Sequence, residues 1–147
     1  MSFFQKLLSN RILLTALLAW AIAQVTKTIL HAIVNKGIDW ERLVGDGGMP
    51  SCHSATVCAL ATAAALHQGA DSPIFALAAV MAIIVMHDAR GVRRESGRHA
   101  KALNELLDLL MGEAAPEVKL KEMLGHSPLQ VLIGALIGVG TAFLLWR

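Results

Sequence analysis

The sequence of 147 residues contains no tyrosine, four phenylalanines and three tryptophans, and only 16% of its residues are charged. So few aromatic side chains argue against a surface on which nucleic-acid bases stack. A net charge of +2 is too small to indicate a polyanionic partner, so we expect no nucleic acid. The two cysteines, Cys52 and Cys58, form no disulfide framework and no Cys/His ligand pattern. We interpret them as reduced thiols and expect no metal and no other cofactor.

Apolar residues are abundant instead: they make up 55% of the chain, which is more than an ordinary soluble domain contains. The length is that of one domain, residues 1–147. We predict an all-α integral membrane bundle with about four transmembrane helices and one amphipathic helix. The transmembrane helices are expected at residues 12–34, 54–68, 73–92 and 128–146, and the amphipathic helix at 95–111. The second span is short and rich in Ala and Thr, so we expect it inside the bundle.

The first apolar run, residues 12–34, is long enough to cross a hydrocarbon core of about 30 Å. Gln24, Lys27 and His31 are spaced three and four apart in it and share one helix face. Because a lysine inside a span costs about 2.5–3.5 kcal/mol, we expect this face to look into the bundle. The alternative to an inward-looking face is that Lys27 lies near a membrane edge, where its side chain can reach the polar surface. A cleaved signal peptide is a second one, since Ala21-Ile22-Ala23 resembles a cleavage site.

Residues 47–54 read Gly-Gly-Met-Pro-Ser-Cys-His-Ser and lie between two apolar runs. The glycines permit a close backbone approach, and Pro50 biases the preceding residue away from helix. We expect a helix of small residues from Ala55, so that Ser51 to Ser54 lie at a helix N-terminus, whose free N–H groups form an anion site. His53 at that edge can donate a proton to a phosphate ester. The alternative is a serine that only caps the helix beside an incidental histidine.

Two further polar clusters flank apolar runs. Asp88, Arg93 and Arg94 follow the third run, and Gly-His-Ser-Pro-Leu-Gln at 125–130 precedes the last one, with the Ser, Pro and Gln of a helix start. In a four-helix topology these clusters share one membrane face with Lys27 and His53. Converging basic groups are what an anion site needs. Positive-inside counting favours the cytoplasm for this face.

These three motifs, in this order, resemble the divergent membrane branch of the type 2 phosphatidic acid phosphatases, also labelled acid phosphatase/vanadium-dependent haloperoxidase-related proteins. The resemblance extends from about Ala23 to the C-terminus. It implies an integral membrane protein of a bacterial or plastid-type inner membrane. It also implies metal-independent hydrolysis of a lipid phosphate or a polyprenyl diphosphate through a phosphohistidine intermediate.

The resemblance also implies residue roles. His126 is the expected nucleophile and His53 the expected general acid. Phosphate binding is expected from four residues: Lys27, Ser51, Arg93 and Arg94. Asp88 and Gln130 are expected to orient catalytic groups. The expected partners are membrane lipid and a lipid phosphate. A homodimer is also expected, because the family core usually has six helices and this chain has fewer.

The sequence departs from the family pattern at two important positions. Cys52 stands where the motif has glycine, and Gln130 replaces a carboxylate four residues after the motif histidine. These departures favour an alternative, a membrane protein that binds anionic lipid headgroups without efficient hydrolysis. A small transporter or channel subunit, with Gln24, Lys27 and His31 lining a polar path, is the second alternative. We favour the enzyme.

Overall fold

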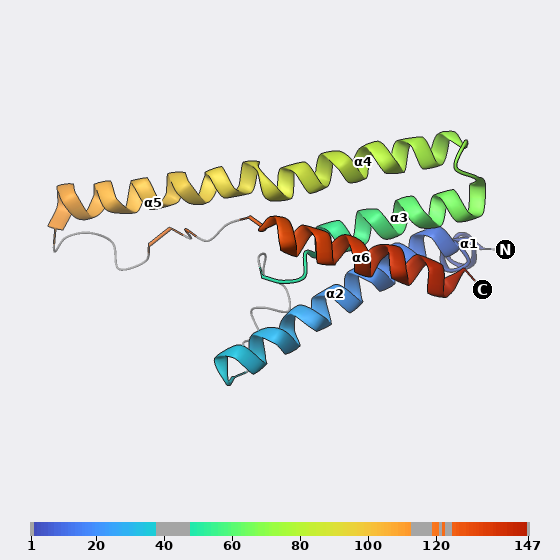
Figure 1. Ribbon diagram of the computed structural model, residues 1–147, viewed down its shortest axis with the longest axis horizontal. Helices are drawn as coiled ribbons and strands as arrows, with labels where there is room; N and C mark the ends of the chain where they lie inside the picture. Colours follow the sequence, from blue (N-terminus) through green and yellow to red (C-terminus); the bar gives the residue numbers. More distant parts are fainter. Residues whose placement is uncertain (1, 38–47, 113–118, 121, 123–124, 147) are drawn as a thin grey trace.

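The computed structural model of the chain describes residues 2–37, 48–112, 119–120, 122 and 125–146. These residues form six helices and no strand, which confirms the predicted all-α class (Figure 1). The helices are α1 (Phe3–Leu8), α2 (Arg11–Asn35), α3 (Cys52–Gln68), α4 (Pro73–Arg90), α5 (Val92–Met111) and α6 (Pro128–Leu145). The four predicted spans correspond to α2, α3, α4 and α6, with ends that differ by one or two residues.

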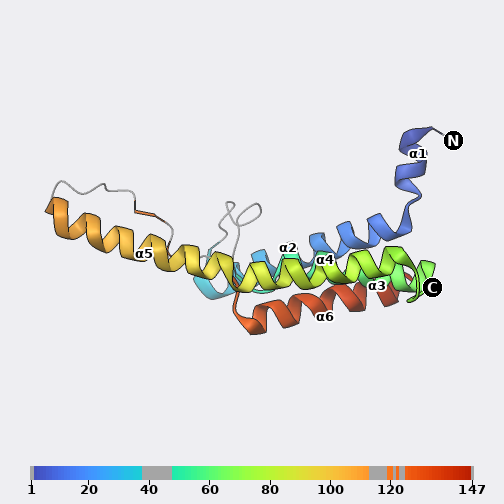
Figure 2. The same ribbon diagram turned by 90° about the horizontal axis from the view of Figure 1, so that it is seen from above.

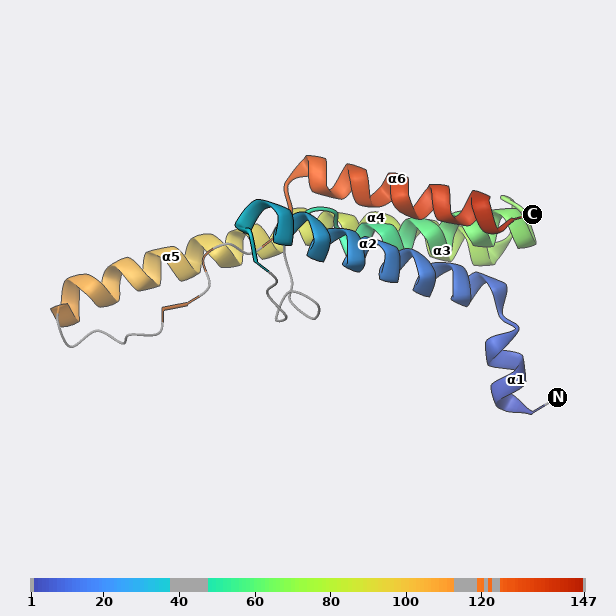
Figure 3. The same ribbon diagram turned by 90° about the horizontal axis from the view of Figure 1, so that it is seen from below.

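Helix α3 occupies the middle of the bundle and packs against α2, α4 and α6. The short helix α1 precedes α2 and projects away from the other helices (Figures 2 and 3). Our sequence interpretation did not include α1. Its signal was present as a capping box, in which Ser2 Oγ accepts from the Gln5 N–H and the Gln5 side chain accepts from the Ser2 N–H.

Within the part of the chain that the structure describes, three helical segments are long and apolar enough to cross a membrane: α2, the α4–α5 segment Pro73–Met111, and α6. Helix α3 has 17 residues, about 26 Å at 1.5 Å per residue, and is not among them. The predicted count of four spans is therefore approximate, whereas the predicted position of the Ala-rich helix inside the bundle is confirmed.

The bundle buries small side chains and exposes large apolar ones. Ala19, Ala23, Ala55, Ala59 and Ala64 are fully buried. The exposed side chains include Leu17, Ile29, Leu77, Ile83 and Leu136. In water this distribution would leave a large apolar surface unsatisfied, whereas lipid tails solvate it and small residues let helix backbones approach. The outer surface of the bundle is therefore lipid-facing.

Two glycines of α6 set the distance between α6 and α3. A Cβ atom on Gly134 would collide with the Ser51 carbonyl, and one on Gly138 would collide with the Ala55 carbonyl and the Ala59 nitrogen. These two glycines thus form a small-residue contact face. It brings the first turns of α3 and α6 together, close to the motif histidines: His53 lies in the first turn of α3, and His126 directly precedes the N-cap of α6.

Replacing Gly138 with alanine should lower the free energy of unfolding by about 1–3 kcal/mol, because backbone atoms of α3 cannot move aside for the added methyl group. Gly140 is the matched control, since a Cβ there meets open space and the helix gains propensity. Thermal unfolding of both variants in detergent would measure the difference. Equal midpoints for the two variants would contradict the proposed close α3–α6 contact.

Helix α5 continues beyond the bundle from the end of α4 (Figure 1). It begins at Val92, earlier than the predicted residue 95, and its leucine face is largely exposed. The Asn104 side chain of α5 bonds both backbone groups of Leu120: its amide nitrogen donates to the Leu120 carbonyl and its oxygen accepts from the Leu120 N–H, both at 3.0 Å.

Candidate phosphate site

The N-terminus of α3 is held by a serine cap. Ser51 is fully buried, and its Oγ accepts hydrogen bonds from the Ser54 N–H at 3.3 Å and the Ser54 Oγ at 3.0 Å. The Ser51 N–H donates to the Gln130 carbonyl at 3.0 Å. The predicted helix start is thus confirmed, and the positive ends of α3 and α6 lie together. A phosphate contact by the Ser51 hydroxyl stays a prediction.

His126 is placed by the junction of α4 and α5. Its backbone N–H donates to the Ala89 carbonyl at 2.9 Å. The preceding Gly125 has φ +88°, and a Cβ there would lie 2.7 Å from the Arg94 nitrogen, so only glycine fits this turn. The His126 side chain is buried, 4% exposed. Sequence reasoning missed the roles of Ala89 and Gly125, although a glycine directly before a motif histidine was a visible signal.

The two motif histidines face each other. The ring centroids of His53, from the first turn of α3, and His126 are 6.0 Å apart, with an interplanar angle of 58°. Two imidazoles at this separation can both reach one phosphate group, since each needs only a contact of about 3 Å. The predicted convergence of the two motifs is therefore present.

Gln130 determines which nitrogen of His126 carries the proton. Its Oε1 accepts from the Ser127 N–H at 3.0 Å and lies 3.2 Å from His126 Nδ1. An amide oxygen only accepts hydrogen bonds, so Nδ1 must donate to it and Nε2 keeps the lone pair. The capping box is present, and the same Gln130 oxygen lies within hydrogen-bond reach of His126; an orienting role for Gln130 in catalysis stays a prediction. Nε2 is thereby available as a nucleophile.

Two cationic side chains, those of Lys27 and Arg93, lower the pKa of His126 through their positive charge. Lys27 of α2 is 4% exposed, and no acidic side chain among the described residues forms a salt bridge with it. Arg93 is half-buried, and its Nε lies 4.0 Å from Asp88 Oδ2. Asp88 is thus placed to orient Arg93. The predicted burial of the polar face of α2 is confirmed for Lys27.

Burial lowers the pKa of His126 below its ordinary value of 6.5. The hydrogen bond to Gln130 raises this pKa, and the positive charges of His53, Lys27 and Arg93 lower it. The net direction is downward, so His126 is neutral at pH 7. A neutral imidazole is the nucleophilic form.

The activity that depends on His126 should therefore persist at pH 6.5 and decline only at lower pH, where the lone pair on Nε2 becomes protonated. The measurement is the pH profile of kcat/KM, which reports groups of the free enzyme. His99→Ala, which changes an exposed histidine of α5, is the control and should give the same pH profile as the wild type. An acidic limb centred above pH 6.5 in the wild type would contradict the lowered pKa.

The remaining predicted residues lie at the edge of the site or outside it. Arg94 is exposed, and of the two arginines only Arg93 acts on His126. Cys52 is buried, and its Sγ donates to Gln24 Oε1 at 2.8 Å. This thiol therefore points to α2, and the departure from glycine brings no side chain between the histidines.

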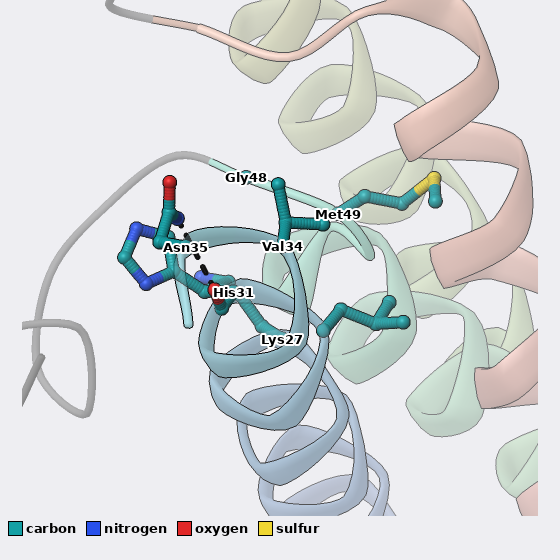
Figure 4. A pocket seen from close by; sticks show the side chains of 7 residues that line it. Lys27, His31, Val34, Asn35, Gly48 and Met49 are labelled. Atoms are coloured by element: carbon teal, nitrogen blue, oxygen red, sulfur yellow. Dashed lines mark hydrogen bonds between the residues drawn. The ribbon is translucent and has the colours of Figure 1, made fainter. Parts of the chain in front are cut away.

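A pocket of about 260 Å³ adjoins the site at Lys27 (Figure 4). Its lining comes from the last turns of α2 and the start of the segment before α3: Lys27, Leu30, His31, Val34, Asn35, Gly48 and Met49. The sequence predicted Lys27 and His31 on one face but did not indicate a pocket, because its apolar walls resemble any lipid-facing helix surface.

Comparison with known proteins gives two findings. The family model described as "Divergent PAP2 family" matches residues 8–141. A Bacillus subtilis (strain 168) protein, "Uncharacterized membrane protein YuiD", is 42% identical over 146 residues, which cover 91% of this chain and 92% of the relative. No solved structure matches the chain.

Proposed function

Because this chain belongs to the Divergent PAP2 family, we propose that it is a membrane phosphatase that hydrolyses a lipid phosphate or polyprenyl diphosphate through a phosphohistidine. The observation that carries the proposal is the pair of facing rings, His53 and His126, beside two cationic side chains. Lys27 and Arg93 supply the positive charge that phosphoryl transfer requires, so the proposal needs no metal ion. All of these groups lie at one end of a lipid-facing bundle.

The chemistry proceeds in two steps. Lys27 and Arg93 bind the phosphate oxygens, and His126 Nε2 attacks phosphorus. The P–N bond forms as the P–O bond to the lipid breaks, and protonated His53 gives its proton to the leaving oxygen. Water then attacks the phosphohistidine with neutral His53 as general base. The P–N bond breaks, inorganic phosphate leaves, and both histidines return to their starting states.

Gln130 limits this cycle, because an amide orients His126 but cannot stabilise a positive ring by charge. Replacing Gln130 with glutamate should therefore raise phosphate release, by about tenfold or more if the pair behaves as in other His–carboxylate systems. The Ser127 N–H contact survives, since a carboxylate also accepts it. Steady-state rates of both proteins test this prediction. An unchanged rate would show that the residue at position 130 does not orient His126 for catalysis.

The proposed function is tested by phosphate release from purified protein in detergent. The substrates are phosphatidic acid, phosphatidylglycerol phosphate and a polyprenyl diphosphate, each with and without EDTA, and the control is His126→Ala. Release that survives EDTA and disappears in the variant supports the proposal. Binding of these lipids without any release would instead support the headgroup-binding alternative, which the neutral Gln130 favours.

A further inference from the structure

One face of the α4–α5 segment changes from apolar to basic where the segment leaves the bundle (Figure 1). Val80 and Ile83 are 56% and 65% exposed on the lipid-facing surface of α4. The exposed residues His87, Arg90 and Arg94 follow Ile83 at spacings of four, three and four residues. Residues three and four apart are neighbours on a helix surface, so all five lie on one side. This side presents hydrocarbon first and then two guanidinium groups.

The helix continues through Gly91, which keeps Arg90 and Arg94 on the same side. The Gly91 N–H donates to the His87 carbonyl at 2.8 Å. Its carbonyl accepts from the N–H groups of Arg94 and Glu95 at 3.0 and 3.1 Å. The two arginines are consequently one helical turn apart, so both side chains can contact one phosphate group.

Arg90 and Arg94 lie at the depth of lipid phosphates. Helix α4 has 18 residues from Pro73 to Arg90. This is a length of about 27 Å, which nearly matches a hydrocarbon core of about 30 Å. With Pro73 at one edge of the hydrocarbon, Arg90 lies at the other edge, and Arg94 lies about 6 Å further out. Val80 and Ile83 then contact acyl chains, whereas the guanidinium groups lie among the headgroups.

The charge of this arginine pair has no counterion in the described part of the protein. Among the described residues, no carboxylate forms a salt bridge with Arg90 or Arg94. The arginine between them differs, since Arg93 pairs with Asp88 at 4.0 Å and its charge acts on His126. Basic residues directly outside a membrane span attract anionic headgroups, and the planar guanidinium matches the oxygens of a phosphate. An anionic lipid is therefore the partner that complements this face.

We propose that Arg90 and Arg94 bind the phosphate of an anionic phospholipid from the surrounding bilayer, and that an acyl chain of this lipid lies along Val80 and Ile83. This lipid site lies outside the histidine pair, and it does not depend on the proposed phosphatase function. The turn at Gly125 packs against the backbone of Arg94. A lipid held by this arginine thus also fixes the turn at the level of the headgroups.

The test measures lipid binding to the purified protein in a neutral detergent by native mass spectrometry. Dioleoyl phosphatidylglycerol and dioleoyl phosphatidylcholine are titrated separately, and the wild type should bind the anionic lipid about tenfold more tightly or better. The double variant Arg90→Gln/Arg94→Gln should lose this preference. Each single variant should weaken phosphatidylglycerol binding about fivefold, which keeps the test decisive if the double variant does not fold.

Arg98→Gln/Lys101→Gln is the matched control, because it removes the same charge from the same helix. Arg98 pairs with Glu95 at 2.7 Å and Lys101 with Glu105 at 3.8 Å, so the protein itself neutralises these two cations. The control variant should keep the preference for phosphatidylglycerol. The substituted side chains are exposed in both double variants, so both should unfold at the wild-type midpoint in the absence of lipid.

Three results would overturn the lipid site. The first is equal affinity of the wild type for the two lipids. The second is an equal loss of binding in the two double variants, which would show a response to net charge alone. The third is displacement of phosphatidylglycerol by an equal concentration of inorganic phosphate, since a soluble anion would then occupy the site without an acyl chain.

A preference for phosphatidylglycerol that disappears only in Arg90→Gln/Arg94→Gln supports the proposal. Phosphatidylglycerol carries no phosphomonoester, so none of these measurements depends on phosphate release. The lipid site therefore stands if the phosphatase function fails, and the phosphatase function stands if the lipid site fails.

Discussion

Replacing His126 with alanine should reduce phosphate release by about 10³-fold or more, because the variant loses the atom that forms the covalent bond to phosphorus. The geometry supports this expectation: Nδ1 is held by Gln130 Oε1 at 3.2 Å, and burial lowers the pKa of the ring. The proposed nucleophile is therefore neutral at pH 7, with its Nδ1 turned to Gln130. Initial rates of phosphate release measure the effect.

His99 provides the control for this experiment. His99 lies exposed on α5, so His99→Ala should retain full activity. Brief mixing with ³²P-labelled substrate and denaturation in alkali should then leave label on the wild type and none on His126→Ala. If the label persists in the His126 variant, another residue is the nucleophile, and the proposed mechanism is contradicted.

Replacing Lys27 with methionine should produce opposite effects on stability and binding. Lys27 is almost fully buried, and no described acidic residue pairs with it, so the ligand-free protein bears the desolvation cost of its charge. A methionine of similar length removes that cost. We expect the free energy of unfolding to rise by about 1–4 kcal/mol, the range found when buried charges are replaced by apolar residues.

The same variant should lose phosphate binding. Truncating a buried charge that contacts an anion costs about 2–5 kcal/mol, so affinity should fall about 30-fold or more. Lys36→Met is the matched control, because Lys36 is exposed at the end of the same helix and lies outside the pocket. Thermal unfolding and phosphonate titration of both variants provide the measurements. A destabilised Lys27→Met protein would show that the ammonium group has a structural role instead of a ligand-binding one.

Several features of the fold could be predicted from the sequence because they depend on neighbours within one or two helical turns. Ser72 and Pro73 begin α4, and Ser127 and Gln130 begin α6, as their order in the chain indicates. Apolar length predicted the membrane-spanning helices, and small residues predicted the interior position of α3. The single departure in helix number, α1, also has a local signal in its capping box.

The candidate site was only partly predictable. His53 and His126 were chosen from their motifs, and their meeting was inferred from the topology. The sequence could not predict which of the two arginines, Arg93 or Arg94, would lie near His126. This depends on how α5 is rotated about its axis after Gly91. Likewise, the direction of the Cys52 thiol depends on Gln24, 28 residues earlier in the chain.

The sequence by itself determined the membrane class, the starts of α4 and α6, and the set of residues able to handle a phosphate group. These follow from side-chain polarity and from hydrogen bonds between residues close in the chain. Tertiary structure alone decided which of those residues act together. The 6.0 Å approach of His53 and His126 exists because Gly134 and Gly138 let α6 lie against α3, and because Ala89 and Gly125 fix the turn before His126. Such contacts join atoms far apart in sequence, and they form only when the packed helices exclude every other arrangement.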